Sequence, residues 1–191
     1  ADGERVYSVG EDDGLTSTAH ALSFDQANGK LALMNTQLTQ GGAPCYINIT
    51  PDGKTVITAN YMGANISLIP LETSGRLSEN VSTIDFTGEG EMKNRQDQPH
   101  LHCVEFTPDG KYLVANDLGT DKIHVFPLDS DGKPDEKATF DVNLEPASGP
   151  RHLCFSKDGR FAYLINEISG KVTTLSYDGK VLTPVQYIEA D

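Results

Sequence analysis

Three residues suited to acid–base chemistry and anion binding occupy comparable places in a repeated sequence: His102, Arg151 and Glu167. Histidine exchanges a proton near neutral pH, arginine presents a planar fork to a carboxylate or phosphate, and glutamate accepts a proton or holds the arginine. His102 and Arg151 each precede a Gly-containing turn by six residues. We predict that the three form one catalytic site, with a structural Arg–Glu ion pair as the alternative. His152 is expected to point away from Arg151, because side chains alternate along a strand.

Three further residues are predicted substrate contacts because they lie at or beside equivalent positions of the repeat: Cys45, His100 and Asp117. Each also has a simpler interpretation. Cys45 can be a packing residue, His100 a loop histidine without a role, and Asp117 a turn former.

The elements that position these residues are strands joined by a recurring turn. The turn has a similar sequence each time, at intervals of 57 and 49 residues: Pro51-Asp52-Gly53-Lys54, Pro108-Asp109-Gly110-Lys111 and Lys157-Asp158-Gly159-Arg160. Short apolar strands flank every copy. Repeats of about 40–50 residues with four antiparallel strands each are typical of a β-propeller, whose blades face one central channel. We predict an all-β propeller with about three and a half blades of a seven-bladed ring, roughly 1–40, 41–98, 99–148 and 149–191.

Three local features refine this prediction. The segment Asp2-Gly3-Glu4 stands where the repeated turn is expected, so the sequence enters partway through a blade. The strand after each repeated turn is expected to end in an asparagine: Asn60, Asn116 or Asn166. The stretch from Gly110 to Asn116 is one residue shorter than its counterparts, which predicts a bulge or a shortened strand there. The polar connection Gly88–Pro99 is either a binding loop or a solvated insertion. Because propellers close into rings, the missing half is expected from the rest of a longer chain or from a second copy.

Composition limits the function classes. The formal net charge of −13 argues against nucleic-acid binding, and no apolar run is long enough for a membrane span. Cys45, Cys103 and Cys154 are predicted to be buried free thiols, which favours the cytoplasm. The first residue is Ala1 rather than Met, so removal of a signal peptide would instead indicate a periplasmic or secreted protein. No CxxC or His-rich motif is present, and no metal site is predicted.

The chain resembles the propeller-type 6-phosphogluconolactonases and the related carboxy-cis,cis-muconate lactonizing enzyme over nearly its whole length. Five segments carry the resemblance: Gly42-Ala43-Pro44-Cys45, Pro99-His100-Leu101-His102, Asn116-Asp117-Leu118-Gly119-Thr120-Asp121, Gly149-Pro150-Arg151-His152-Leu153 and Asn166-Glu167. The resemblance implies a seven-bladed propeller with its site in a cleft at the end of the central channel. It also implies that His102, Arg151 and Glu167 act there, with a further arginine from a later blade beyond this sequence.

The function implied by the resemblance is hydrolysis of a small anionic lactone, 6-phosphogluconolactone to 6-phosphogluconate in the oxidative pentose phosphate route, without metal or organic cofactor. Glu167 would activate water, Arg151 would bind the anion and steady the oxyanion, and His102 would protonate the leaving alkoxide. One alternative is lactone formation from an unsaturated diacid by the same cluster. Another is a noncatalytic propeller that binds a protein or a glycan, which predicts an ordinary titration of His102.

Overall fold

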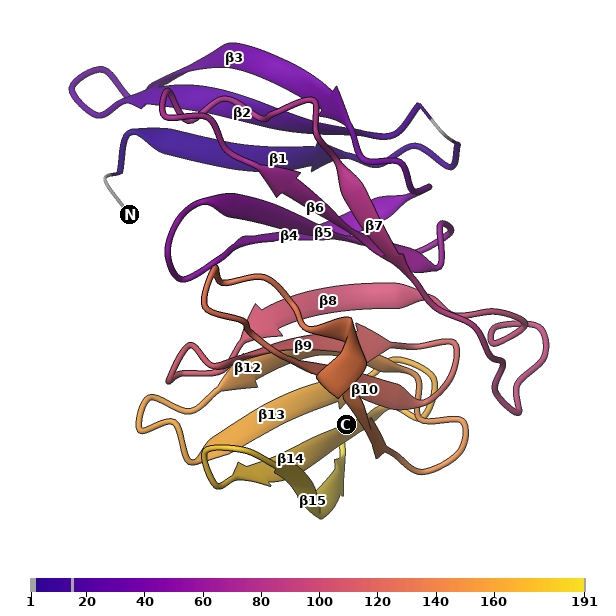
Figure 1. Cartoon of the computed structure of the whole chain (residues 1–191). Coiled ribbons are helices and arrows are strands. Elements are labelled where there is room, and N and C mark those ends of the chain that lie inside the picture. Colours follow the sequence, from indigo (N-terminus) through magenta and orange to yellow (C-terminus); the bar gives the residue numbers. More distant parts are fainter. Residues whose placement is uncertain (1–2, 15, 191) are drawn as a thin grey trace. The chain divides into compact units, whose positions relative to one another are not determined.

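The computed structural model describes residues 3–14 and 16–190, and nearly all of its regular structure is β-strand (Figure 1). Four antiparallel sheets follow one another along the chain, the first with three strands and the others with four. Within every sheet, strands consecutive in sequence are hydrogen-bonded neighbours. Small meandering sheets of this kind are the blades of a β-propeller, so the predicted all-β propeller class is confirmed. The part of the predicted first turn formed by Asp2 lies outside the described residues.

The chain divides into two compact units, of which the first is Ala1–Asp85. Its strands are β1 (Arg5–Gly10), β2 (Thr18–Asp25), β3 (Lys30–Leu38), β4 (Pro44–Ile49), β5 (Thr55–Asn60), β6 (Asn65–Pro70) and β7 (Ser82–Asp85). Small residues of β2 pack against larger aliphatic residues of the second sheet, in a core formed by Ala19, Ala21, Val56, Ile69 and Leu77. Burial of these apolar side chains is the main force that holds the two sheets of this unit together.

The second unit is Phe86–Asp191 and carries most of the predicted site. Its elements are β8 (Leu101–Phe106), β9 (Tyr112–Asp117), β10 (Lys122–Pro127), the 3₁₀ turn η1 (Glu136–Ala138), β11 (Phe140–Asn143), β12 (Pro150–Phe155), β13 (Phe161–Asn166), β14 (Lys171–Tyr177) and β15 (Leu182–Glu189). A core of buried apolar side chains joins its two sheets and includes Val114, Ile123, Leu153, Leu164 and Leu175. This packing fixes β8 and β9 beside β12, which brings the predicted site residues together.

The repeated turn has the same hydrogen bonds in each complete sheet. A Thr or Ser hydroxyl before the turn donates to the turn Asp at 2.7 Å in all three copies, namely Thr50–Asp52, Thr107–Asp109 and Ser156–Asp158. The glycine that follows has a positive φ of 67–71° each time, a conformation that costs glycine little. The turn chemistry predicted from the sequence is therefore present three times.

The first strand of the β8–β11 sheet contains a β-bulge at a candidate site residue. Leu101 and Cys103 pair with the adjacent residues Asp117 and Asn116, so His102 is the extra residue between them. A bulge redirects the side chain of its extra residue and is common beside active sites. The local geometry of β8 therefore serves to aim His102.

The other two complete sheets repeat this irregularity. In β4 the extra residue is Cys45, and in β12 the register shifts between Pro150 and Leu153, the segment that contains Arg151. Equivalent strands thus bulge at each of the positions that the repeat comparison aligned. The bulges were not predicted at these places, because no glycine or other special residue type marks them.

The predicted equivalence of Asn116 with Asn60 and Asn166 is wrong by one residue. The strands β5, β9 and β13 each contain six residues, and they end at Asn60, Asp117 and Asn166. The stretch that follows Gly110 is therefore not shortened. The expected irregularity lies opposite it, in β8, and Asp117 takes the structural place of the two asparagines.

All three cysteines are free, as predicted, but they are not all buried. Cys103 is buried, Cys45 is partly buried, and Cys154 is exposed because strand alternation places it opposite the buried Leu153. Across residues 3–14 and 16–190, no helix has the length and apolar character that a membrane crossing requires.

Candidate active site

Three segments of the second unit converge at the candidate site. His102 comes from the bulge of β8, Arg151 from the bulge of β12, and Glu167 from the first position after β13. The backbone N–H of Glu167 donates to the carbonyl of Gly149 at 2.7 Å, which places Glu167 beside the start of β12. The Asn116 side chain donates to the Arg151 carbonyl at 3.0 Å and ties β9 to β12. Backbone and side-chain hydrogen bonds therefore hold the segments in place.

The structure brings together the three residues predicted to be catalytic. Arg151 Nε donates to Glu167 Oε2 at 2.9 Å, and His102 Nε2 lies 3.8 Å from the same oxygen. The His102 side chain is 9% exposed, whereas the Arg151 and Glu167 side chains are 40% and 31% exposed. The imidazole is thus buried behind an accessible Arg–Glu pair. Their catalytic roles remain predictions.

A second arginine belongs to this cluster and was missed from the sequence. Arg95 Nη2 donates to Glu167 Oε1, the oxygen that Arg151 does not use, and its side chain is 40% exposed. Arg95 lies in the connection between β7 and β8, which has no counterpart in the repeat. The only sequence signal was the polar loop Gly88–Pro99, whose interpretation as a binding loop this contact favours over a solvated insertion.

Burial and positive charge act on the imidazole of His102. Burial is the largest cause, and the nearby Arg151 guanidinium adds to it, so that the pKa of His102 falls from 6.5 to about 4. The His152 ring packs edge-on against the His102 ring, with centroids 5.2 Å apart. Burial and then Arg151 lower the pKa of His152 as well. His102 is therefore a neutral imidazole near pH 7.

The position of His152 was predicted from simple strand alternation, which placed it away from Arg151. Its ring contacts that of His102. The register shift in β12 interrupts the two-residue alternation of side chains there, and the direction of His152 relative to Arg151 stays a prediction.

Glu167 is an ionised carboxylate with both oxygens engaged. Partial burial alone would raise its pKa, but the hydrogen bond and charge of Arg95, then the hydrogen bond of Arg151 and the electrostatic effect of His102, hold the pKa below its ordinary value. A carboxylate between two guanidinium groups is a poor proton acceptor and a good anchor for arginines. This arrangement favours an anion-binding cluster with His102, rather than Glu167, as its base.

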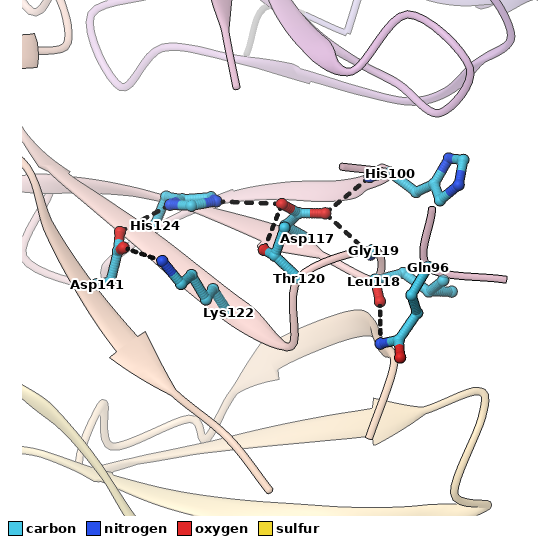
Figure 2. A network of polar contacts seen from close by, with 9 residues as sticks. All are labelled: Gln96, His100, Asp117, Leu118, Gly119, Thr120, Lys122, His124 and Asp141. Atoms are coloured by element: carbon cyan, nitrogen blue, oxygen red, sulfur yellow. Dashed lines mark hydrogen bonds and ion pairs between the residues drawn. The ribbon is translucent and has the colours of Figure 1, made fainter. Parts of the chain in front are cut away.

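Asp117 lies in a buried network of the β8–β11 sheet, drawn in Figure 2. Its side chain is 0% exposed. Asp117 Oδ1 accepts from the backbone N–H groups of His100 and Gly119, at 2.7 and 2.9 Å, and Oδ2 accepts from the Thr120 hydroxyl at 2.6 Å and lies 3.4 Å from His124 Nε2. Through these bonds Asp117 fixes the backbone at His100, the residue just before β8. Direct contact with substrate stays a prediction for it.

His100 and Cys45, the other predicted substrate contacts, have different settings. The His100 side chain is buried, and its Nε2 lies 3.7 Å from Asp97 Oδ1. Cys45 belongs to the first unit, where it is the bulge residue of β4 and its thiol lies 3.8 Å from the Ala59 carbonyl. Substrate binding remains a prediction for both residues. The described residues contain no group of three or more His, Cys, Asp or Glu side chains that could hold a metal ion.

Comparisons with known proteins agree with the propeller fold. A family model described as "Lactonase, 7-bladed beta-propeller" matches residues 1–191. The 6-phosphogluconolactonase of Bacillus subtilis is 35% identical over 173 residues, which are 91% of this chain and 48% of that protein. A Formosa agariphila protein of the same name is 35% identical over 90% of this chain and 49% of its own length. The chain thus spans about half the length of the curated relatives it matches.

Solved structures show the same relationship. A Bacteroides fragilis protein provisionally named a 6-phosphogluconolactonase has a TM-score of 0.91 and 44% identity, and the match covers all of this chain and 55% of that one. The periplasmic gluconolactonase of Pseudomonas aeruginosa has a TM-score of 0.85 and 30% identity over 98% of this chain and 55% of its own.

Proposed function

The chain belongs to the lactonase family of seven-bladed β-propellers, and on that premise we propose that the whole protein hydrolyses 6-phosphogluconolactone to 6-phosphogluconate. One observation supports the proposal: Arg95 and Arg151 both donate hydrogen bonds to the Glu167 carboxylate. The buried, neutral imidazole of His102 lies beside this carboxylate. Two partly exposed guanidinium groups suit an anionic substrate, and an adjacent uncharged base suits activation of water.

Substrate binding is the first step. The side chains of Arg95 and Arg151 are each 40% exposed, so an incoming anion can reach them without prior opening of the core. Glu167 holds both groups in the absence of substrate and keeps them oriented. The bound anion offsets the charge of Arg151, and the pKa of His102 then rises from its low value toward the range of an effective base.

Proton transfer through His102 completes the hydrolysis. The neutral imidazole takes a proton from water as the water oxygen attacks the lactone carbonyl carbon. Arg151 faces the resulting oxyanion and stabilises it. The ring C–O bond then breaks, and the imidazolium, 3.8 Å from the Glu167 carboxylate, returns the proton to the leaving alkoxide. The net reaction adds one water and yields a hydroxy acid, which ionises at neutral pH.

This scheme changes two roles expected from the sequence. Glu167 orients arginines instead of activating water, because both of its oxygens already accept hydrogen bonds. His102 acts first as a base and only afterwards as an acid, because its lowered pKa leaves no proton to donate at the start.

The other blades are proposed to come from the rest of a longer protein or from a second copy. Apolar side chains are exposed on β13 and β15, at Tyr163, Ile165, Val185 and Ile188, all at 43% or more. Leu31 and Leu33 of β3 are also exposed, at 53% and 63%. Sheet faces of this kind are normally covered by a neighbouring blade. The further arginine that the family resemblance implies would come from those blades.

The proposal is tested by product analysis with the whole protein. It is incubated separately with freshly prepared 6-phosphogluconolactone and with an unsaturated diacid of the muconate type, and proton NMR follows both reactions. Release of 6-phosphogluconate above the spontaneous rate supports the proposal. Ring closure of the second compound without lactone hydrolysis would instead establish the cyclase. We also propose a cytoplasmic location, which the free thiols favour, and the periplasm is the alternative.

A further inference from the structure

One buried carboxylate connects the segments that carry the two arginines. Asp121 is 7% exposed, and its oxygens accept three hydrogen bonds from N–H groups outside its own hairpin. Asp121 Oδ1 accepts from the Gln96 side chain at 2.8 Å and from the Gly149 backbone at 2.7 Å, and Oδ2 accepts from the Ala147 backbone at 2.7 Å. We infer that Asp121 is a positioning residue that fixes Arg95 and Arg151 around Glu167.

The first connection runs through Gln96 to Arg95. Gln96 is 0% exposed, and its amide N–H group also donates to the Leu118 carbonyl at 2.9 Å (Figure 2). Its side-chain oxygen accepts from the Met92 backbone at 3.0 Å. The backbone N–H groups of Arg95 and Gln96 in turn donate to the Met92 carbonyl, at 2.8 and 2.7 Å. Gln96 therefore closes a compact turn, and its bond to Asp121 attaches the turn that carries Arg95.

The second connection runs through the turn before β12 to Arg151. Asp121 accepts hydrogen bonds from the backbone of Ala147 and Gly149, which lie four and two residues before Arg151. Both have positive φ, at 57° and 64°. The Gly149 carbonyl accepts from the Glu167 backbone N–H at 2.7 Å. The same turn thus sets the position of Arg151 and of the carboxylate between the arginines.

The hairpin itself does not require an aspartate at this position. Asp121 has a φ of 57°, and the equivalent residues of the two other complete sheets are Ala64 and Gly170, with φ of 51° and 68°. Those residues have no polar side chain, and their hairpins form nevertheless. The backbone needs a left-handed residue there, which glycine supplies without strain. The carboxylate of Asp121 is therefore explained by the segments that it connects.

The consequence for catalysis depends on the proposed function. Recognition of an anion by two guanidinium groups needs a fixed separation between them, because charge-assisted pairs are directional. Loss of Asp121 is expected to raise KM for the phosphorylated lactone about tenfold, with a smaller change in kcat. The geometric claim does not depend on any substrate, because Glu167 reports on both arginines through its own titration.

The test compares three variants with wild type by carbon-13 NMR titration of the Glu167 carboxyl group, assigned with Glu167→Gln, in the whole protein. Asp121→Gly keeps the hairpin and removes the carboxylate, and Gln96→Met releases only Arg95. Asp109→Asn is the matched control, because it removes an acidic charge from the repeated turn of the same sheet. Because the arginines lower the pKa of Glu167, we expect both test variants to raise it and the control to leave it unchanged.

The outcomes separate the two proposals. A wild-type Glu167 titration in folded Asp121→Gly and in Gln96→Met overturns the positioning role, whatever the activity. If Asp121→Gly does not fold, Gln96→Met decides alone, and an unchanged Glu167 pKa again overturns the inference. A raised pKa in a protein without lactonase activity would support the positioning role and reject only the proposed function.

Discussion

Arg95 and Arg151 donate hydrogen bonds to opposite oxygens of one carboxylate, that of Glu167. One arginine comes from the loop before β8 and the other from a bulge in β12, so residues 56 positions apart in sequence share one partner. Two cations on one anion leave a net positive charge at this point of a protein with a formal net charge of −13. An anionic substrate is therefore attracted locally although the protein as a whole repels it.

Arg95 is expected to contribute to substrate binding more than to the chemical step. Replacement by alanine should raise KM for 6-phosphogluconolactone about tenfold, in keeping with loss of one partly exposed charge-assisted contact, while kcat changes less. Arg95→Lys should restore only part of the binding, because lysine lacks the planar fork. Steady-state kinetics of the whole protein measure both values. A fall in kcat at constant KM would assign Arg95 to the chemistry instead.

The titration of His102 should appear in the pH dependence of stability. The pKa of His102 is about 4 in the folded protein, whereas the unfolded chain has the ordinary value of 6.5. As the pH falls, His102 is therefore protonated in the unfolded chain before it is protonated in the folded protein. Stability is therefore complete above pH 6.5 and decreases down to pH 4. At pH 5 the loss amounts to about 2 kcal/mol.

The variant His102→Gln cannot lose stability in this way. Between pH 8 and pH 5, the free energy of unfolding should fall by about 2 kcal/mol less in His102→Gln than in wild type. Urea denaturation at the two pH values measures the difference. Equal pH dependence of the two proteins would show that His102 titrates normally and would remove the case for a neutral base.

Gly119 should be intolerant of a side chain. A Cβ atom there would lie 1.9 Å from the Gln98 carbonyl oxygen and 2.8 Å from the His100 backbone nitrogen. These are backbone atoms, which can shift only if the chain around them is distorted. Gly119→Ala should therefore destabilise the protein by about 1–3 kcal/mol and displace the loop that carries Arg95. Thermal unfolding and KM report the two effects.

Gly14→Ala is the matched control for that substitution. Its nearest contact would be the Thr16 hydroxyl at 3.7 Å, an ordinary van der Waals distance. A Gly119→Ala variant as stable as Gly14→Ala would contradict the close approach of the loop to the β9–β10 hairpin.

The fold could be predicted well from the sequence because its signals are local. Turn residues such as Asp52 and Gly53 determine a conformation within four residues, and alternating apolar residues indicate the strands beside them. The bulges could not be predicted, since they depend on pairing with a second strand. Asn116 was misaligned for a related reason: it matches Asn60 and Asn166 in type, whereas the strand end is set by the hydrogen-bond register at Asp117.

The candidate site was predicted in part. The repeat comparison identified His102, Arg151 and Glu167, because equivalent positions of adjacent blades become neighbours in space. Arg95 was missed because it lies between blades, where no equivalent position exists. The setting of Asp121 was missed as well, since its three partners come from segments far apart in sequence. Contacts such as these have no equivalent in the other repeats, so only the three-dimensional structure reveals them.

The most direct test of the proposed function is the hydrolysis of 6-phosphogluconolactone by the whole protein and by its Arg151→Ala variant. Arg160→Ala is the control, because Arg160 is an exposed arginine of the same sheet, paired with Asp158. We predict measurable wild-type activity, a fall in kcat/KM of about a hundredfold or more in Arg151→Ala, and no change in Arg160→Ala. Wild-type kinetics in a folded Arg151→Ala variant would contradict the assignment of this cluster as the catalytic site.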